Sequence, residues 1–280
     1  MPLDYENDVL AIKEWLTKET YLPNDLDDHV IKKFLHSCYG SLEKTKQCID
    51  KFCSGRYNMP EIYTSRDPSS VKLQNAFSIT NLACYEAGEN EILIHQLDAP
   101  SLDKFEYYDA MKTFGIQADY WLKIVQFIAN GHIVIMDIKY ITLKIIPKAN
   151  IFHFQKFLIF LLEAMPVRLK QVHIINCPSY YEKLFALIKA ALPQEIIDLI
   201  NFHTSHEGLH SFIDKKYLPQ EYGGEASSYK EQQRNWVKLI DGDRKLFLND
   251  NLWKADLTRK IKDNGENTAM NGSFRTLSID

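Results

Sequence analysis

Apolar positions in the first fifty residues recur at helical spacing. Val9, Ile12 and Leu16 lie three and four residues apart, which places them on one face of a helix. A second pattern of this kind covers residues 30–35, and a third covers residues 42–52, after a break at Tyr39-Gly40. The pattern predicts three short helices joined by tight turns, followed by a linker near residue 70.

From about residue 71 the pattern changes to strands that alternate with helices. Four short apolar runs predict strands, at 91–97, 132–138, 172–177 and 198–203. Two longer periodic stretches between them predict helices, at 105–130 with a break at Gly115, and at 149–164. Because long helices separate the strands, the sheet is expected to be mainly parallel, which makes this an α/β protein.

The stretch from 165 to 193 is the most informative. A near-continuous apolar strand stops at Pro178, and Ser179 lies three residues before Glu182, the spacing of a capping box at a helix start. The helix that follows has a wide apolar face. One interpretation is a core helix packed on the sheet, and the other is a lid over an apolar cavity.

Composition narrows the classes of protein that fit. Of the 280 residues, 45% are hydrophobic and 25% are charged, which is typical of a globular chain. A net charge of −4 argues against nucleic-acid binding. The first ten residues carry three acids and no apolar run, and no apolar window is long enough to span a bilayer. Five cysteines without a Cys-x-x-Cys motif indicate reduced thiols and a cytoplasmic protein.

Candidate chemistry is sparse, so we expect neither an enzyme nor a cofactor. His206, Glu207 and His210 match His-Glu-x-x-His, which on a helix would point to a zinc hydrolase, but Gly208 weakens that helix and no third histidine follows. We therefore expect no metal, with a zinc hydrolase as the weakest alternative. Asp137 ends a strand, where it could meet a ligand or cap the next loop.

Other polar residues near the third strand have simple interpretations. His173 and Asn176 are expected to be satisfied polar groups in or near the core. Arg168 and Lys170 are interpreted as part of a solvated turn. With 15 phenylalanines and 15 tyrosines and no convincing catalytic set, an apolar pocket can itself be the function.

Several separated motifs, in order, resemble the CRAL-TRIO lipid-binding family. Residues 131–138 resemble its Gly-hydrophobic-Asp strand, and residues 165–178 resemble its Pro-x-Arg-x-x-x-x-His-hydrophobic-x-Asn-x-Pro signature. Residues 218–224 resemble its Leu-Pro-x-Glu-Tyr-Gly-Gly end mark. Asp28, Phe34-Leu35, Arg56 and Pro60-Glu61 resemble the helical module that precedes the domain, and residues 272–275 are similar to the tail of insect members.

The resemblance implies a helical module at 1–70, a lipid-binding domain at 71–232 with a lidded hydrophobic pocket, and a C-terminal helix and extended tail at 233–280. It implies a cytosolic carrier that binds one small hydrophobic ligand, such as a retinoid, a tocopherol or a similar lipid, and exchanges it at membranes. The helix after Pro178, with the segment through Ile200, would be the gate. We expect a monomer, and the alternative is a ligand-independent membrane or protein adaptor.

Strand alternation and helical spacing, with the family's pocket side as guide, select the candidate pocket residues. They are Met136, Leu143, Phe157, Leu161, Ile174, Tyr180, Leu184, Ile188, Leu192, Ile196 and Phe202. The gate helix adds Tyr181, Phe185 and Leu187. Tocopherol- and retinal-binding relatives carry basic residues after the gate that are implicated in phosphoinositide binding. The matching residues 192–198 are acidic and apolar here, with only Lys189 nearby, which predicts weak recognition by this route.

Overall fold

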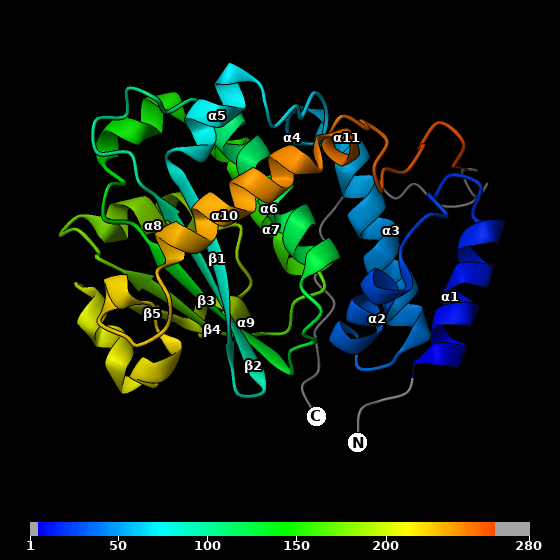
Figure 1. Cartoon of the computed structure of the whole chain (residues 1–280), viewed down its shortest axis with the longest axis horizontal. Coiled ribbons are helices and arrows are strands. Elements are labelled where there is room, and N and C mark those ends of the chain that lie inside the picture. The colour runs from blue at the N-terminus through cyan, green and yellow to red at the C-terminus, as the bar shows by residue number, and fades with distance from the viewer. Residues whose placement is uncertain (1–4, 261–280) are drawn as a thin grey trace.

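A computed structural model describes residues 5–260 of the chain. The first part is helical, as predicted, and Figure 1 shows its first three helices grouped at one end of the molecule. Val9, Ile12 and Leu16 of the first helix are buried. The helices of this part are α1 (Glu6–Lys18), α2 (Asp28–Ser37), α3 (Leu42–Asn58), α4 (Pro60–Tyr63) and α5 (Val71–Phe77).

A five-stranded sheet follows, with its strands in the order of the chain. The strands are β1 (Thr80–Ala87), β2 (Asn90–Leu97), β3 (Gly131–Asp137), β4 (Leu169–Ile175) and β5 (Ile200–Phe202). β1 pairs with β2 antiparallel, and the other pairs are parallel. The α/β architecture with a mainly parallel sheet is therefore confirmed, although β1 was not predicted.

Helices connect the strands and cover the sheet. Figure 1 shows α10 crossing β1, and the short helical turns η2–η4 gathered near β5. The longer helices are α6 (Tyr107–Ile124), α7 (Ile151–Ala164), α8 (Tyr181–Lys189) and α10 (Tyr229–Gly242). The short ones are α9 (Gln194–Ile197), α11 (Arg244–Phe247), η1 (Leu143–Lys148), η2 (His206–Ser211), η3 (Lys215–Tyr217) and η4 (Gln220–Tyr222).

Two predicted helix boundaries were wrong. α6 runs through Gly115 without a break and ends at Ile124. A Cβ atom at Gly115 would lie 3.1 Å from the Ile62 side chain, so this glycine allows α4 to pack closely against α6. The predicted cap at Ser179 is also wrong, since α8 begins at Tyr181 after the N-cap residue Tyr180 and has no side-chain cap.

The hydrophobic core is continuous between the N-terminal helices and the rest of the molecule. The ring of Phe52 on α3 lies 6.2 Å from Phe160 on α7 and 5.9 Å from Trp253, measured between centroids. Gly55 lets α3 approach α7, because a Cβ atom there would lie 2.4 Å from the Phe160 ring. The domain boundaries near 70 and 232 remain predictions, and the predicted tail motif at 272–275 lies outside the described residues.

Three buried charges join the N-terminal helices to α6. Arg56 on α3 forms a bidentate ion pair with Asp119 on α6, and Arg66 donates to the same carboxylate at 2.6 Å. All three side chains are at most 1% exposed. Burial would raise the pKa of the Asp119 carboxyl, but the two guanidinium groups outweigh it, so the pKa is lowered and the group stays ionised.

The two faces of the sheet differ in how completely they are covered. On one face Ile92, Ile135 and Ile175 have no exposed surface, and they pack with residues of η2–η4 and with Tyr229 of α10. The opposite face carries Val134 and Met136, which are only half-buried. Because successive strand residues point to opposite faces, this contrast separates a closed side of the sheet from a more open one.

Candidate functional site

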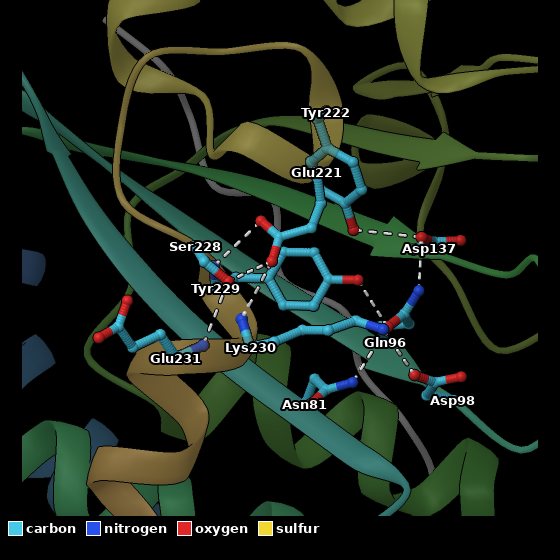
Figure 2. A network of polar contacts seen from close by, with 10 residues as sticks. All are labelled: Asn81, Gln96, Asp98, Asp137, Glu221, Tyr222, Ser228, Tyr229, Lys230 and Glu231. Carbon is cyan, nitrogen blue, oxygen red and sulfur yellow. Dashed lines mark hydrogen bonds and ion pairs between the residues drawn. The ribbon is translucent and has the colours of Figure 1, made fainter.

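Asp137, at the carboxyl end of β3, is the centre of a buried polar network (Figure 2). Its carboxylate accepts hydrogen bonds from Gln96 Nε2 at 2.7 Å, Asn176 Nδ2 at 2.9 Å and the Tyr222 hydroxyl at 3.2 Å. It also accepts from the backbone N–H of Lys139 at 3.0 Å, which is the loop-capping role considered for it. Asp137 therefore holds β2, β3 and η4 together.

Residues 218–224, which carry the Leu-Pro-x-Glu-Tyr-Gly-Gly motif, pack on the closed side of the sheet. Tyr222 is buried and reaches Asp137, while Glu221 accepts from the Ser228 hydroxyl and the Tyr229 N–H at the start of α10 (Figure 2). Gly223 adopts a positive φ of 70°. A Cβ atom at Gly224 would lie 1.9 Å from the carbonyl oxygen of Leu218, so glycine is required there. These packing roles account for the motif without a catalytic or ligand-binding role for its residues.

His173 and Asn176 are satisfied polar groups, as predicted. His173 is fully buried, and its Nδ1 lies 3.0 Å from Nε2 of His203 on the segment after β5. Its Nε2 lies 3.1 Å from the side-chain oxygen of Gln171, so Nε2 carries the proton and Nδ1 accepts from His203. Burial, followed by the neighbouring His203, lowers the pKa of His173 to about 4.

The His-Glu-x-x-His segment does not form an α-helix. It forms the 3₁₀ turn η2, in which the rings of His206 and His210 lie 6.4 Å apart. His210 Nε2 is 2.9 Å from the carbonyl oxygen of Tyr222, to which it donates. Within residues 5–260, no cluster of three or more His, Cys, Asp or Glu side chains could hold a metal ion.

The open face of the sheet brings several predicted pocket residues together. Ile174 on β4 pairs with Met136 on β3 and Phe202 on β5, so the three side chains point to the same side. The Phe202 ring lies 4.8 Å from Tyr181 and 5.1 Å from Phe185, both on α8. The first turns of the predicted gate helix therefore lie over this face.

The remaining predicted residues occupy the segments around this face. Leu184, Leu187 and Ile188 on α8 are half-buried, as are Leu161 on α7, Leu192, and Ile196 on α9. Phe157 is 2% exposed and lies 5.5 Å from Phe114, whose ring lies 5.2 Å from that of His95 on β2. Leu143 on η1 is 41% exposed.

Two hydrogen bonds connect α8 to the segments beside it. Gln155 on α7 donates from Nε2 to the backbone oxygen of Leu187 at 2.7 Å. The hydroxyl of Tyr180 donates to the backbone oxygen of Ile141 at 3.4 Å. α8 is therefore held both by these two hydrogen bonds and by the ring contacts of Tyr181 and Phe185 with Phe202.

The sequence reasoning missed residues with the same orientation as the predicted ones. Leu93 pairs with Val134, and His95 pairs with Met136, so both β2 residues point to the open face. Strand alternation, applied to the whole of 91–97, could have identified them. Val134 lies two residues before Met136 and therefore on the same face, so strand alternation could have identified it as well.

The interpretation of Arg168 as part of a solvated turn was wrong. The side chain is half-buried, its guanidinium donates to the backbone oxygen of His36 on α2, and it lies 4.0 Å from the Tyr39 ring centroid. Lys170 is exposed. The sequence could not indicate the role of Arg168, because its partners lie about 130 residues away.

Comparisons with known proteins agree with this architecture. Residues 2–73 match the Pinta-like UBA domain, and residues 92–224 match the CRAL/TRIO domain. The solved structure of Sfh5 has the same fold, with a TM-score of 0.50 at 16% identity, covering 83% of this chain and 92% of Sfh5. Among the helices of residues 5–260, none has the length and hydropathy of a membrane span.

Curated relatives match different shares of the chain. The alpha-tocopherol transfer protein-like protein of Mus musculus is 26% identical over 235 residues, which is 83% of this chain and 68% of the relative. Clavesin-1 of Rattus norvegicus is 31% identical over 81 residues, covering 29% of this chain and 22% of clavesin-1. The CRAL/TRIO match, these relatives and the shared fold together show that residues 92–224 form a domain of the CRAL-TRIO family.

Proposed function

We propose that the protein is a cytoplasmic carrier that encloses one small hydrophobic molecule between the open face of the sheet and α8, and exchanges it at membrane surfaces. A retinoid, a tocopherol or a similar lipid fits this proposal. α8, with the segment through Ile200, would act as the gate. No catalytic step is part of the proposed function.

The observation that carries this proposal is the incomplete burial of apolar side chains on the open face of the sheet and on α8, where the Tyr181 and Phe185 rings pack on Phe202. Met136 and Phe202 on the sheet, and Leu184 and Ile188 on α8, are all half-buried, whereas Ile92, Ile135 and Ile175 on the other face are fully buried. Protein cores are normally packed to high density. A ligand bound between the sheet and α8 would complete the burial of these groups.

His95 gives independent support from the middle of the sheet. Burial alone lowers the pKa of His95 to about 4, as expected for an imidazole surrounded by protein. Its ring lies 5.2 Å from that of Phe114, and its pairing with Met136 places it on the open face of the sheet. The neutral His95 is therefore a candidate polar contact for the ligand.

The energetics favour a gate over a permanently open cleft. Enclosing about 400 Å² of apolar ligand surface is worth on the order of 10 kcal/mol at roughly 25 cal/mol per Å², before the costs of association. A ligand held this strongly leaves slowly unless its cover moves. A membrane lowers the cost of exposing the apolar face of α8, so opening and exchange would occur there. The name of the alpha-tocopherol transfer protein-like relatives agrees with this proposal.

Organic-solvent extraction of the purified chain, followed by mass spectrometry, tests the proposal. We expect about one lipid molecule for each protein molecule, and its mass identifies the ligand class. A protein that is empty in repeated preparations, and that takes up no retinoid, tocopherol or sterol from vesicles, would instead support a ligand-independent adaptor.

A further inference from the structure

Two cysteines lie at the connection between α2 and α3. Cys38 is the residue that ends α2, and Cys48 lies on α3. A short turn joins the two helices, and the N–H of Ser41 closes it by donating to the carbonyl oxygen of Cys38 at 3.1 Å. Both cysteines are free thiols, and both are half-buried. The N-terminal helices therefore hold two reduced thiols on either side of one turn.

The packing of α2 on α3 places these two thiols opposite each other. The rings of Phe34 on α2 and Phe52 on α3 lie 5.3 Å apart. Cys38 comes four residues after Phe34, and Cys48 comes four residues before Phe52, so each cysteine shares a helix face with the phenylalanine. Both lie one turn nearer to the connection between the helices. Two helices that meet at 34 and 52 therefore also meet at 38 and 48.

The two thiols hydrogen-bond to each other, and this contact makes them unequal. Hydrogen bonding with Cys48 lowers the pKa of the Cys38 thiol, burial opposes the shift, and the hydroxyl groups of Ser37 and Thr45 add to it. Ser37 Oγ lies 3.9 Å from Cys38 Sγ. The same contact between the thiols, followed by burial, raises the pKa of Cys48. Cys38 is therefore the thiol that ionises first, and the thiolate is the nucleophilic form.

Cys48 also connects α3 to the end of α7. Its Sγ lies 3.6 Å from the backbone oxygens of Glu163 and Ala164, to which the thiol can donate. The hydrogen on Cys48 can turn from these carbonyl groups toward an ionised Cys38, because rotation about the Cβ–Sγ bond is free. The arrangement thus provides a nucleophilic thiolate with a second thiol in contact with it.

We propose that Cys38 and Cys48 form a reversible disulfide when the protein meets hydrogen peroxide. Cys38 Sγ attacks one peroxide oxygen and the O–O bond breaks, which leaves a sulfenic acid and a hydroxide that takes up a proton to become water. Cys48 Sγ then attacks the sulfenic sulfur, the S–O bond breaks, and the second oxygen leaves as water with the Cys48 proton. Two thiols lose two electrons, and one peroxide becomes two water molecules. A thiol reductant restores both cysteines by exchange.

Oxidation changes how the N-terminal helices are held. The disulfide ties α2 covalently to α3, and it takes the Cys48 donor away from the two carbonyl groups at the end of α7. In a reducing compartment such a pair is typical of a transient, redox-sensing site rather than of a permanent structural bridge. The proposal does not depend on the carrier function, because neither cysteine faces the open side of the sheet.

Peptide mass spectrometry of the full chain provides the test. The wild-type protein is treated with hydrogen peroxide, its remaining thiols are alkylated, and it is digested with trypsin without reduction. We expect a cross-link between peptides 34–44 and 47–51, which carry Cys38 and Cys48, and its loss after dithiothreitol treatment. Cys84 is the internal control, since it is also half-buried but burial raises its pKa. Cys38 should be oxidised roughly tenfold faster than Cys84.

Variants separate the two roles. Cys48→Ser should leave a sulfenic acid on Cys38 that dimedone traps, whereas Cys38→Ser should form neither the cross-link nor the dimedone adduct. Cys177→Ser, in the sheet domain, should keep the cross-link of the wild type. Equal oxidation of Cys38 and Cys84, or a wild-type protein in which Cys48 pairs with Cys53 instead, would overturn the proposal without any variant.

Discussion

Asp119 is the residue whose loss should most affect the folded state. It is the carboxylate that Arg56 and Arg66 share in a fully buried position. Asp119→Asn would leave two buried guanidinium groups without a counter-charge, so we expect the free energy of unfolding to fall by about 3–5 kcal/mol. Urea unfolding monitored by tryptophan fluorescence measures this loss.

A surface ion pair provides the control for that experiment. Asp67 pairs with Arg244 on the surface at 2.7 Å, where solvent screens the interaction. Asp67→Asn should leave the urea midpoint near that of the wild type. If Asp119→Asn were equally harmless, the buried cluster would not hold the N-terminal helices to α6 in the way described.

His173 predicts a specific pH dependence. Its pKa of about 4 in the folded protein lies below the value of about 6.5 in the unfolded chain. Between pH 6.5 and pH 4 this residue therefore binds a proton in the unfolded chain but not in the folded protein. The free energy of unfolding consequently decreases as the pH falls through this range. His173→Asn should reduce the slope of stability against pH in this window by about 1.4 kcal/mol per pH unit. Parallel curves for wild type and variant would contradict the assignment.

At the scale of elements, α8 is the part that the proposed function needs most. Leu184 and Ile188 are half-buried, whereas Ala186 on the same helix is exposed. Leu184→Asp or Ile188→Asp should abolish ligand retention and leave the fold largely intact, because a carboxylate in the pocket wall disfavours an apolar ligand. Retention of a fluorescent retinoid or tocopherol analogue on gel filtration measures the effect.

Ala186→Asp is the matched control for the gate. It adds the same charge to the same helix on its solvent side, so we expect normal retention. Loss of the ligand in both the Ala186 and the Leu184 variants would indicate a general disturbance of α8. Unchanged retention in the Leu184 and Ile188 variants would show that α8 does not form the gate.

The elements with strong periodicity were predictable, and those set by distant contacts were not. The helical spacing of Val9 and Ile12 correctly predicted the apolar face of α1. The apolar runs at β2 and β3 correctly predicted these strands. β1 was missed because it mixes polar residues such as Asn81 and Glu86 into its pattern. Gly115 was predicted to break the helix. Glycine is instead needed there for close packing against Ile62, a contact that can be seen only in the fold.

At the scale of the whole molecule, the candidate sites also contain some features that the sequence could predict and others that it could not. Met136 and Ile174 could be placed on one face by strand alternation, because both lie in regular strands. The role of Arg168 could not be predicted, since its partners His36 and Tyr39 lie far away along the chain and meet it only after folding. Motifs identified the family, whereas the contacts that give each residue its role required the structure.

The central claim is that the space between the open face of the sheet and α8 belongs to a ligand. A crystal structure of the protein as purified from cells, without added lipid, tests it most directly. We predict elongated electron density for one lipid beside Met136, Leu184 and Phe202. The same side chains in direct contact with one another, with no space between them and no lipid, would contradict the account.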